Sequence, residues 1–405
     1  MRFLNLYVKE IFFSISIIIL CLLDLNLYSL IEINYPLSKF WGFYQKALLV
    51  IISLILFILY NGWKNCPSLL KIYLIIVCSS MTMIYMYSSI NYPSNELYNI
   101  ILQSNQFFLI FLSFPLYKFF IKQKGYYHIF NLLNIVVFIW YILCIAQSVT
   151  YSVTGTLFLN VFENIRNNSL RIDLIGIPNI MFLYNFCQVF YNKENKSKLF
   201  NIVQLLLGLY CIVFIQQTRA YYIVFICSIL AIIVFYRRMT VVRLFFILSC
   251  LIFISYYAIN SGFLDSFGPN SEDYGSTVAR LGAYSYFWNS FLHNPLFGHG
   301  IIASVDLLSI STGPYGIYFY ADVGFVGALA QYGVFILLLY VLPILYGIVS
   351  VYKRIQSRNV DPFAIGFLMY VIVSSSTLLC TNDMRSFLWP FFIAFLAYES
   401  SVITK

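Results

Sequence analysis

Residues 199–236 read LFNIVQLLLGLYCIVFIQQTRAYYIVFICSILAIIVFY, and this stretch decides the fold class. Two apolar runs flank one short polar turn, Gln216–Arg219. Each run is close to the ~20 mostly apolar residues that an α-helix needs to cross a bilayer. Membrane β-barrels instead show short segments of alternating polarity. The stretch therefore predicts two membrane-spanning helices joined by a minimal hairpin.

The rest of the chain has the same apolar character. Of its 405 residues, 61% are hydrophobic, 20% are aromatic and only 10% are charged. An ordinary soluble domain has ~25% charged residues. The composition excludes a soluble enzyme, a disordered chain and a secreted disulfide scaffold. We expect an all-α polytopic membrane helical bundle that forms one integral membrane domain over residues 1–405.

We expect about twelve membrane-spanning helices, because similar apolar runs recur along the chain. They lie at 11–30, 42–60, 69–88, 98–117, 127–148, 172–191, 200–216, 220–236, 243–260, 322–350, 363–380 and 386–399. A long external loop, 261–321, separates the ninth helix from the tenth. A loop of this length in a compact protein is usually functional or disordered. The first run lacks a small-residue cleavage site and is interpreted as a span, not as a signal peptide.

The distribution of positive charge predicts the orientation in the membrane. With the N-terminus in the cytoplasm, most of the 24 Lys and Arg residues fall on the inner side. This arrangement follows the positive-inside rule, and an even number of spans places the C-terminus in the cytoplasm too. Much of the net charge of +9 then reflects topology, so no nucleic-acid partner is expected. The nine cysteines are scattered, which favours neither disulfides nor a structural metal.

A short helix is expected within the external loop. Ser276 or Thr277 is a suitable N-cap residue. Arg280, Tyr284, Phe287, Trp288 and Phe291 then recur at helical spacing and would form a largely aromatic face. Such a helix can lie in the outer membrane interface. Pro295 and the pair Gly298 and Gly300 would end it.

Arginine on the outer side is the first sign of chemistry. From the second third of the chain onward, every expected outer cation is an Arg: Arg166, Arg171, Arg219, Arg280 and Arg385. The planar guanidinium suits bidentate binding of phosphate. Arg219 in the QQTR turn is the sharpest candidate, although a boundary Arg can also bind lipid headgroups or carbonyls. For Arg166 and Arg171, pairing with Glu163 and Asp173 is the favoured interpretation.

Histidine and aspartate supply the candidate proton acceptors. His293 and His299 lie in HNPLFGHG, residues 293–300. Histidine exchanges a proton near neutral pH and is the commonest general base, but a loop histidine can also simply bind a carbonyl. Asp322 starts the tenth predicted span, where it could act as a base, orient an Arg or cap the helix. The sequence holds no P-loop, Gly-x-Ser-x-Gly, His-Glu-x-x-His or Asp-x-Asp motif, so no metal site or cofactor is expected.

Three motifs follow one another in the second half of the chain. QQTRAYYIVFI, residues 216–226, opens a span with a Thr-Arg pair. RLGAYSYFWNSFLHNPLFGHG, residues 280–300, combines an arginine, an aromatic helix and an Asn-Pro-Leu-x-Gly-x-Gly pattern. DVGFVGALAQYG, residues 322–333, begins the next span with an acidic residue and spaced glycines. In this order, the motifs resemble those of the O-antigen ligase and Wzy-type polysaccharide polymerase superfamily of bacterial membrane glycosyltransferases.

One departure separates the two branches of that superfamily. Ligases usually carry a His-Asn pair shortly before the acidic position, and this histidine is thought to act in catalysis. The corresponding stretch STGPYGIYFYAD, residues 311–322, holds no histidine. The resemblance is therefore closer to a Wzy-type polymerase, and the identity of the base stays open.

The resemblance implies a substrate and roles for the candidate residues. Sugars linked to undecaprenyl (polyprenyl) diphosphate would be polymerised on the outer face, without a metal, into O-antigen, capsular or exopolysaccharide. A growing chain would leave its lipid diphosphate and move to a new lipid-linked repeat unit. Arg219 and Arg280 would bind the diphosphate, with Arg385 as a further contact. His299 is the first candidate for the base, followed by Asp322 and His293.

The implied location is the bacterial inner (plasma) membrane, where the chain would be a multi-pass protein in the lipid bilayer. A flippase and a chain-length regulator are the implied protein partners. Other functions stay open: a flippase or transporter for lipid-linked oligosaccharide, and a ligase-type transferase. Transporters usually show two similar halves, which this sequence lacks. The Arg and His residues on the expected outer face argue against a scaffold without catalysis.

Overall fold

The computed structural model describes residues 2–25, 36–123, 125–159, 165–166, 169–174, 176–192, 197–236, 274–382 and 385–403. The regular elements among these residues are helices and one antiparallel hairpin of two-residue strands, β1 (Ile165–Arg166) and β2 (Ser169–Leu170). The predicted helical fold class is confirmed for this part of the chain, with the hairpin as its exception.

Several helices are suited to crossing a membrane. Within the described part of the chain, five are long and apolar enough: Ser68–Asn91, Leu97–Lys122, Tyr127–Thr154, Lys198–Gln216 and Leu337–Ser357. The chain is therefore a multi-pass membrane protein. The full set of about twelve spans stays a prediction. The expected ninth span, 243–260, lies outside the described residues.

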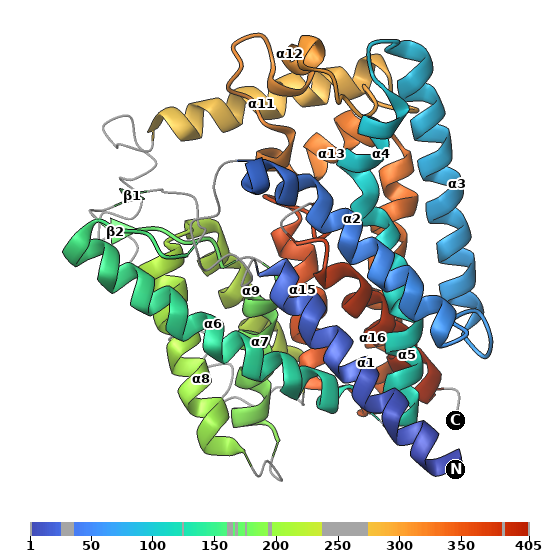
Figure 1. Ribbon diagram of the computed structural model, residues 1–405, viewed down its shortest axis with the longest axis vertical. Helices are drawn as coiled ribbons and strands as arrows, with labels where there is room; N and C mark the ends of the chain where they lie inside the picture. Colours follow the sequence, from blue (N-terminus) through green and yellow to red (C-terminus); the bar gives the residue numbers. More distant parts are fainter. Residues whose placement is uncertain are drawn as a thin grey trace. The chain divides into compact units, whose positions relative to one another are not determined.

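The chain forms two compact units. The first comprises Met1–Cys78, Ser104–Ile223 and Cys380–Lys405. Its helices are α1 (Arg2–Asp24), α2 (Pro36–Leu59), η1 (Asn105–Leu112), α5 (Ser113–Lys122), α6 (Tyr127–Thr154), α7 (Ile177–Phe190), α8 (Lys198–Tyr210), η2 (Cys211–Gln216) and α16 (Leu388–Ile403). In this unit α7 packs on α8, α16 on α5 and α1 on α6. Figure 1 shows α7 and α8 side by side.

Buried amides join three helices of the first unit. Asn134 of α6 and Asn185 of α7 exchange hydrogen bonds of 2.9 and 2.7 Å through their side-chain amides. Asn134 Nδ2 also donates to Asn201 of α8 at 3.2 Å, and Gln204 of α8 donates to the Asn134 carbonyl at 2.8 Å. Such bonds stabilise helix pairs in a membrane, where apolar burial alone gives little preference. They fix the helix pair that leads into the Gln216–Arg219 turn.

The second unit comprises Ser79–Gln103 and Val224–Leu379. Its helices are α4 (Leu97–Ser104), α11 (Tyr274–His293), η4 (Val305–Leu307), α12 (Leu308–Thr312), η5 (Tyr320–Val323), α13 (Gly324–Tyr332), η6 (Leu337–Val341), α14 (Leu342–Ser357) and α15 (Pro362–Ser374). The helices α3 (Ser68–Asn91) and α9 (Arg219–Phe235) contribute residues to both units. α11 packs on α13 (Figure 1) around a small core of Ala283, Phe287, Val323 and Ala330.

The predicted helix in the external loop exists as α11. It begins by Tyr274, so Ser276 and Thr277 lie inside its first turn and not at the N-cap. Phe287 is completely buried, whereas Trp288 is 45% exposed, so the predicted aromatic face is divided between the core and the surface. Contact of this surface with the membrane interface stays a prediction.

The predicted tenth span, 322–350, is not one continuous helix. α13 ends at Tyr332, and Gly333 follows with a φ of +57° before the chain turns helical again. A Cβ atom on Gly333 would lie 2.2 Å from the carbonyl oxygen of Leu296. At a rise of ~1.5 Å per residue, α13 alone is too short to cross a bilayer core of ~30 Å. The helix breaks at Gly333 because the backbone at Leu296 packs against it. A hydropathy profile of the sequence does not reveal such a contact.

Candidate functional site

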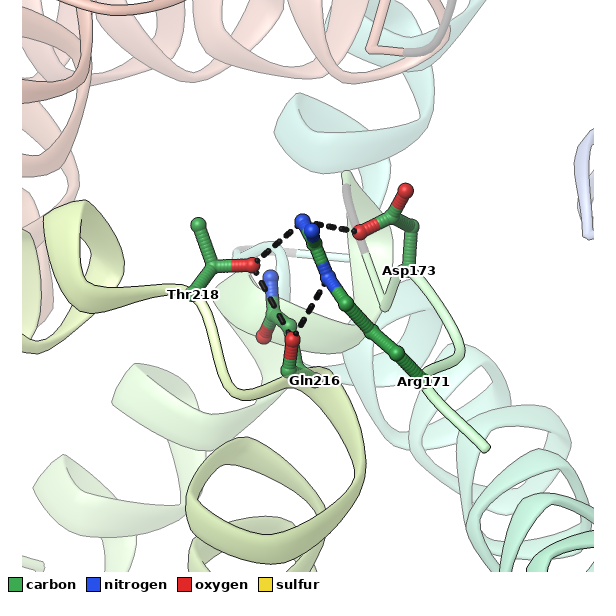
Figure 2. A network of polar contacts seen from close by, with 4 residues as sticks. All are labelled: Arg171, Asp173, Gln216 and Thr218. Carbon is green, nitrogen blue, oxygen red and sulfur yellow. Dashed lines mark hydrogen bonds and ion pairs between the residues drawn. The ribbon is translucent and has the colours of Figure 1, made fainter. Parts of the chain in front are cut away.

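Arg171 holds the polar turn between η2 and α9 in the first unit (Figure 2). Its Nε donates to the Gln216 carbonyl at 3.0 Å, and its NH2 donates to Thr218 Oγ1 at 2.9 Å. The same NH2 lies 3.0 Å from Asp173 Oδ1, which confirms the predicted pairing of these two residues. The Glu163 partner expected for Arg166 lies outside the described residues.

The turn itself is tight, and its first residue, Gln216, is buried. The chain passes through the π-helical turn η2, then through Gln217 in the left-handed region with a φ of +49°, and enters α9 at Arg219. Both polar atoms of the Gln216 side chain are buried and have no hydrogen-bond partner among the described residues. Buried amides without a partner are rare, so this side chain stands out as a candidate for ligand contact.

Arg385 lies at the same end of α9 as Arg219. Its guanidinium sits 4.8 Å above the ring of Tyr221, in the first turn of α9. Arg385 is completely buried, and burial lowers its pKa to about 9. The side chain therefore stays charged at neutral pH. The structure thus brings Arg385 to the start of the helix that Arg219 opens.

A cavity of about 440 Å³ lies in the second unit. Residues from the end of α3, from α11 and from the segment after α11 line it: Tyr87, Tyr92, Tyr286, Asn289, Ser290, His293, Asn294, Gly298, His299 and Ile310. Its size is within the range of small-molecule sites. Two of the three predicted proton acceptors, His293 and His299, therefore meet in one cavity.

His299 is held with one ring nitrogen engaged and the other available. Its side chain is 6% exposed, and Nδ1 lies 2.8 Å from the Gly300 carbonyl oxygen. Because a carbonyl only accepts, Nδ1 carries the proton and Nε2 keeps a lone pair. Nε2 has no hydrogen-bond partner among the described residues. Burial lowers the pKa of His299 to about 4, against a smaller opposing effect of the Gly300 carbonyl, so the ring is neutral at pH 7.

The backbone around His299 is fixed by α13. The His299 amide donates to the Ala330 carbonyl at 2.7 Å. Gly298 has a φ of +63°, and a Cβ atom there would lie 2.1 Å from the same carbonyl oxygen. On the other side, Phe297 stacks on Tyr87 with ring centroids 4.6 Å apart, and Asn294 donates to the Tyr87 hydroxyl. The glycine seen in the sequence thus permits close backbone packing next to the histidine.

Two residues early in the chain also support the cavity. Ser88 Oγ accepts the Ile301 amide at 2.9 Å. Asn95 donates to the Ile301 carbonyl at 2.9 Å, and its Oδ1 accepts the amides of Ala303 and Ser304 at 3.0 and 2.8 Å. Sequence reasoning missed Ser88, Asn95 and the cavity tyrosine Tyr87. The position of Asn95 in a short polar connection between two apolar runs was the available signal.

Arg280 and Asp322 form a separate pair of neighbours. Arg280 lies on α11 and Asp322 in η5, which contact each other. Partial burial raises the pKa of Asp322, and the charge of Arg280 opposes this effect. Neither residue lines the cavity that contains His299. Of the predicted proton acceptors, the structure groups the two histidines and leaves Asp322 beside Arg280.

Residues 204–341 match the family model Wzy_C, described as O-antigen ligase. The matched segment contains Arg219, Arg280, His293, His299 and Asp322, whereas Arg385 follows it. No curated protein matches the chain. The match supports, over these residues, the resemblance to the O-antigen ligase and Wzy superfamily, and it does not distinguish polymerase from ligase.

Proposed function

We propose that this protein polymerises oligosaccharide repeat units carried on polyprenyl diphosphate, on the outer face of the bacterial inner membrane. The family match fits a membrane glycosyl-transfer role, and the apolar helices place the protein in a bilayer. The product would be O-antigen, capsular polysaccharide or exopolysaccharide. Both termini would lie in the cytoplasm.

The observation that carries this proposal is the unpartnered Nε2 of His299, a residue that lines the cavity. A neutral imidazole with Nδ1 fixed as donor is ready to accept a proton at Nε2. In the proposed reaction, Nε2 takes the proton from an acceptor sugar hydroxyl. The hydroxyl oxygen bonds to the anomeric carbon of the growing chain, and the bond from that carbon to the diphosphate oxygen breaks. The diphosphate leaves with the electron pair.

The arginines would stabilise the departing diphosphate. Arg219 opens α9, the Arg385 guanidinium lies over Tyr221 in the first turn of that helix, and the N-terminal end of a helix favours an anion. Arg280 on α11 is the third proposed contact. Fixed positive charge directed at a developing negative charge is usually the largest single contribution to catalysis. Asp322 and His293 remain the alternative bases, and His293 is tested by substitution below.

The segment before Asp322 favours polymerisation over ligation. Residues 311–322 contain no histidine, whereas ligases of the superfamily usually carry a His-Asn pair there. In this protein the histidine with a free nitrogen instead lies upstream, at position 299. The base would therefore reach the acceptor from a different part of the loop.

Deletion of the gene in its native host tests the proposal. Surface polysaccharide would be separated on a gel beside extracted lipid-linked intermediates. A polymerase predicts loss of long chains with single repeat units reaching the outer leaflet. Long chains that remain on the lipid carrier would identify a ligase, and units trapped on the cytoplasmic side a flippase.

Complementation with variants then tests the arginines. Arg219→Ala and Arg280→Ala should each abolish polymer while the protein stays in the membrane. Arg280→Lys should also impair it, because the ammonium cannot form a bidentate contact. Normal chain lengths with both alanine variants would remove the diphosphate role.

A further inference from the structure

Among the residues that the structure describes, the lining of the cavity around His299 is polar and carries no permanently charged side chain. Its lining residues include three tyrosines, two asparagines, a serine and two histidines, and no Lys, Arg, Asp or Glu. This composition differs from that of the other candidate regions, which contain Arg171, Arg280 and Arg385. A cavity that combines aromatic rings with amides and hydroxyls suits a ligand with apolar faces and many hydroxyl groups.

The three tyrosines converge on one part of the cavity. The pKa of Tyr92 is raised by burial and further by the nearby Tyr87 and Tyr286. Tyr87 accepts a hydrogen bond from Asn294 and so keeps its own proton available for donation. Tyr286 donates to the Ile310 carbonyl at 3.2 Å, which leaves its oxygen able to accept. The wall thus offers both a donor and an acceptor.

Two further polar side chains face the cavity without a protein partner. Neither Asn289 nor Ser290 forms a side-chain hydrogen bond with any other residue that the structure describes. Both lie on α11, one helical turn before His293. Asn289 is exposed and Ser290 is partly buried, so both can exchange solvent for a ligand, whereas His299 Nε2 is buried without a partner among the described residues.

We propose that this cavity binds an uncharged sugar ring of the acceptor, with one hydroxyl directed at His299 Nε2, and that it discriminates against uronic acids and phosphorylated sugars. The assignment to the acceptor rests on the proposed function. The selectivity rests on the lining alone, because burying a carboxylate or phosphate without a cationic partner is unfavourable. The diphosphate must then bind outside this cavity.

Saturation-transfer NMR on the purified full chain in lipid nanodiscs tests the selectivity without turnover. The probes are galactose, N-acetylglucosamine and glucuronic acid. At least one neutral sugar should receive saturation, and glucuronic acid should receive clearly less. The double variant Asn289→Ala/Ser290→Ala should weaken the apparent affinity about tenfold, as expected for two lost hydrogen bonds. Ser285→Ala, on the exposed part of the same helix, is the matched control and should bind as the wild type does.

Equal transfer to glucuronic acid, no transfer to either neutral sugar, or unchanged binding by the double variant would overturn the inference. The deletion experiment separates this failure from failure of the proposed function. Loss of polymer without neutral-sugar binding would reject the subsite and keep the polymerase. Neutral-sugar binding in a protein whose deletion leaves polymer intact would reject the polymerase and keep a sugar site.

Discussion

The guanidinium of Arg171 donates to the hydroxyl of Thr218 at 2.9 Å and thereby ties the segment after β2 to the residue that precedes Arg219. A second bond from the same side chain, to the Gln216 carbonyl, fixes the turn at its other end. Because both bonds come from one planar group, they fix the orientation of the turn relative to Arg171 as well as its distance from Arg171. Arg171 is therefore a positioning residue for the start of α9.

Replacing Arg171 with Ala should reduce polymer formation. The turn would lose two charge-assisted hydrogen bonds, and small displacements of a binding group can cost up to ~100-fold in rate. We expect a roughly tenfold to hundredfold decrease in chain elongation, with normal amounts of protein in the membrane. Arg171→Lys should be intermediate, since a lysine cannot bind both acceptors in the same geometry.

Asp173→Asn is the matched control for Arg171. It removes the ion pair and leaves the bonds to Gln216 and Thr218 in place. The Asp173 side chain is 45% exposed, and exposed pairs contribute little. Elongation close to that of the wild type is expected. An equal defect in Asp173→Asn and Arg171→Ala would show that charge pairing, and not the turn, is what matters.

Replacing His299 with Ala should nearly abolish activity. Loss of a general base typically slows a reaction by ~10² to 10⁴-fold. Elongation measured on isolated membranes with lipid-linked repeat units checks this expectation. His293→Ala is the control in the same cavity. Because His293 is exposed, we expect a smaller effect there, and the reverse order would transfer the role of the base to His293.

The activity should persist at acidic pH. Burial lowers the pKa of His299 from the ordinary 6.5 to about 4. The base form is then retained well below pH 6.5, and the acid limb attributable to His299 should lie near pH 4. The stability of the folded protein should also decrease at acidic pH. The contribution of neutral His299 to the free energy of unfolding is present above pH 6.5 and is lost as the pH falls toward 4. An acid limb near 6.5 would contradict this environment.

Gly298→Ala should displace the His299 segment. A Cβ atom would overlap the Ala330 carbonyl oxygen, in addition to the cost of ~1 kcal/mol for a left-handed alanine. Gly316→Ala is the control, because its φ of +69° is similar and its Cβ would meet nothing within 4 Å. Thermal unfolding in detergent and elongation should both be worse for Gly298→Ala. If both variants lost the same stability and activity, the left-handed backbone conformation, and not the contact with Ala330, would be the cause.

Tyr221→Leu should lower the stability of the protein, because Arg385 would lose its contact with an aromatic ring. Tyr221→Phe should largely keep that stability. A desolvated cation over an aromatic face gains up to ~2 kcal/mol, and phenylalanine keeps most of this attraction. The midpoint of thermal unfolding measures the difference between the two variants. If both variants lose the same stability, the hydroxyl and not the ring is the important group.

The helices were predictable because each is a local property of its own apolar sequence. The regular spacing from Arg280 to Phe291 likewise predicted α11. The break at Gly333 was not predictable, since its cause is the Leu296 carbonyl of a distant segment. A hydropathy profile carries no information about contacts between segments that are distant in the sequence.

The candidate site was predictable only in part. The residue types at 293, 299 and 385 pointed to proton transfer and anion binding, and Arg171 and Asp173 are close in sequence. The bond from Arg171 to Thr218 joins residues 47 positions apart, and that from Asn95 to Ile301 joins residues 206 apart. Pairings at such separations follow from the fold and not from any local pattern.

The backbone bonds between the external segment and α13 have a consequence for protein engineering. The His299 amide donates to the Ala330 carbonyl, and the Val334 amide donates to the Pro295 carbonyl. These backbone hydrogen bonds join the segment after α11 to α13 and the residues that follow it. A chimera that exchanges residues 274–321 alone would pair one side of these hydrogen bonds with a foreign partner segment. Specificity should transfer between related chains only when the exchanged blocks extend through Ile336 and include the region of Tyr87 to Asn95.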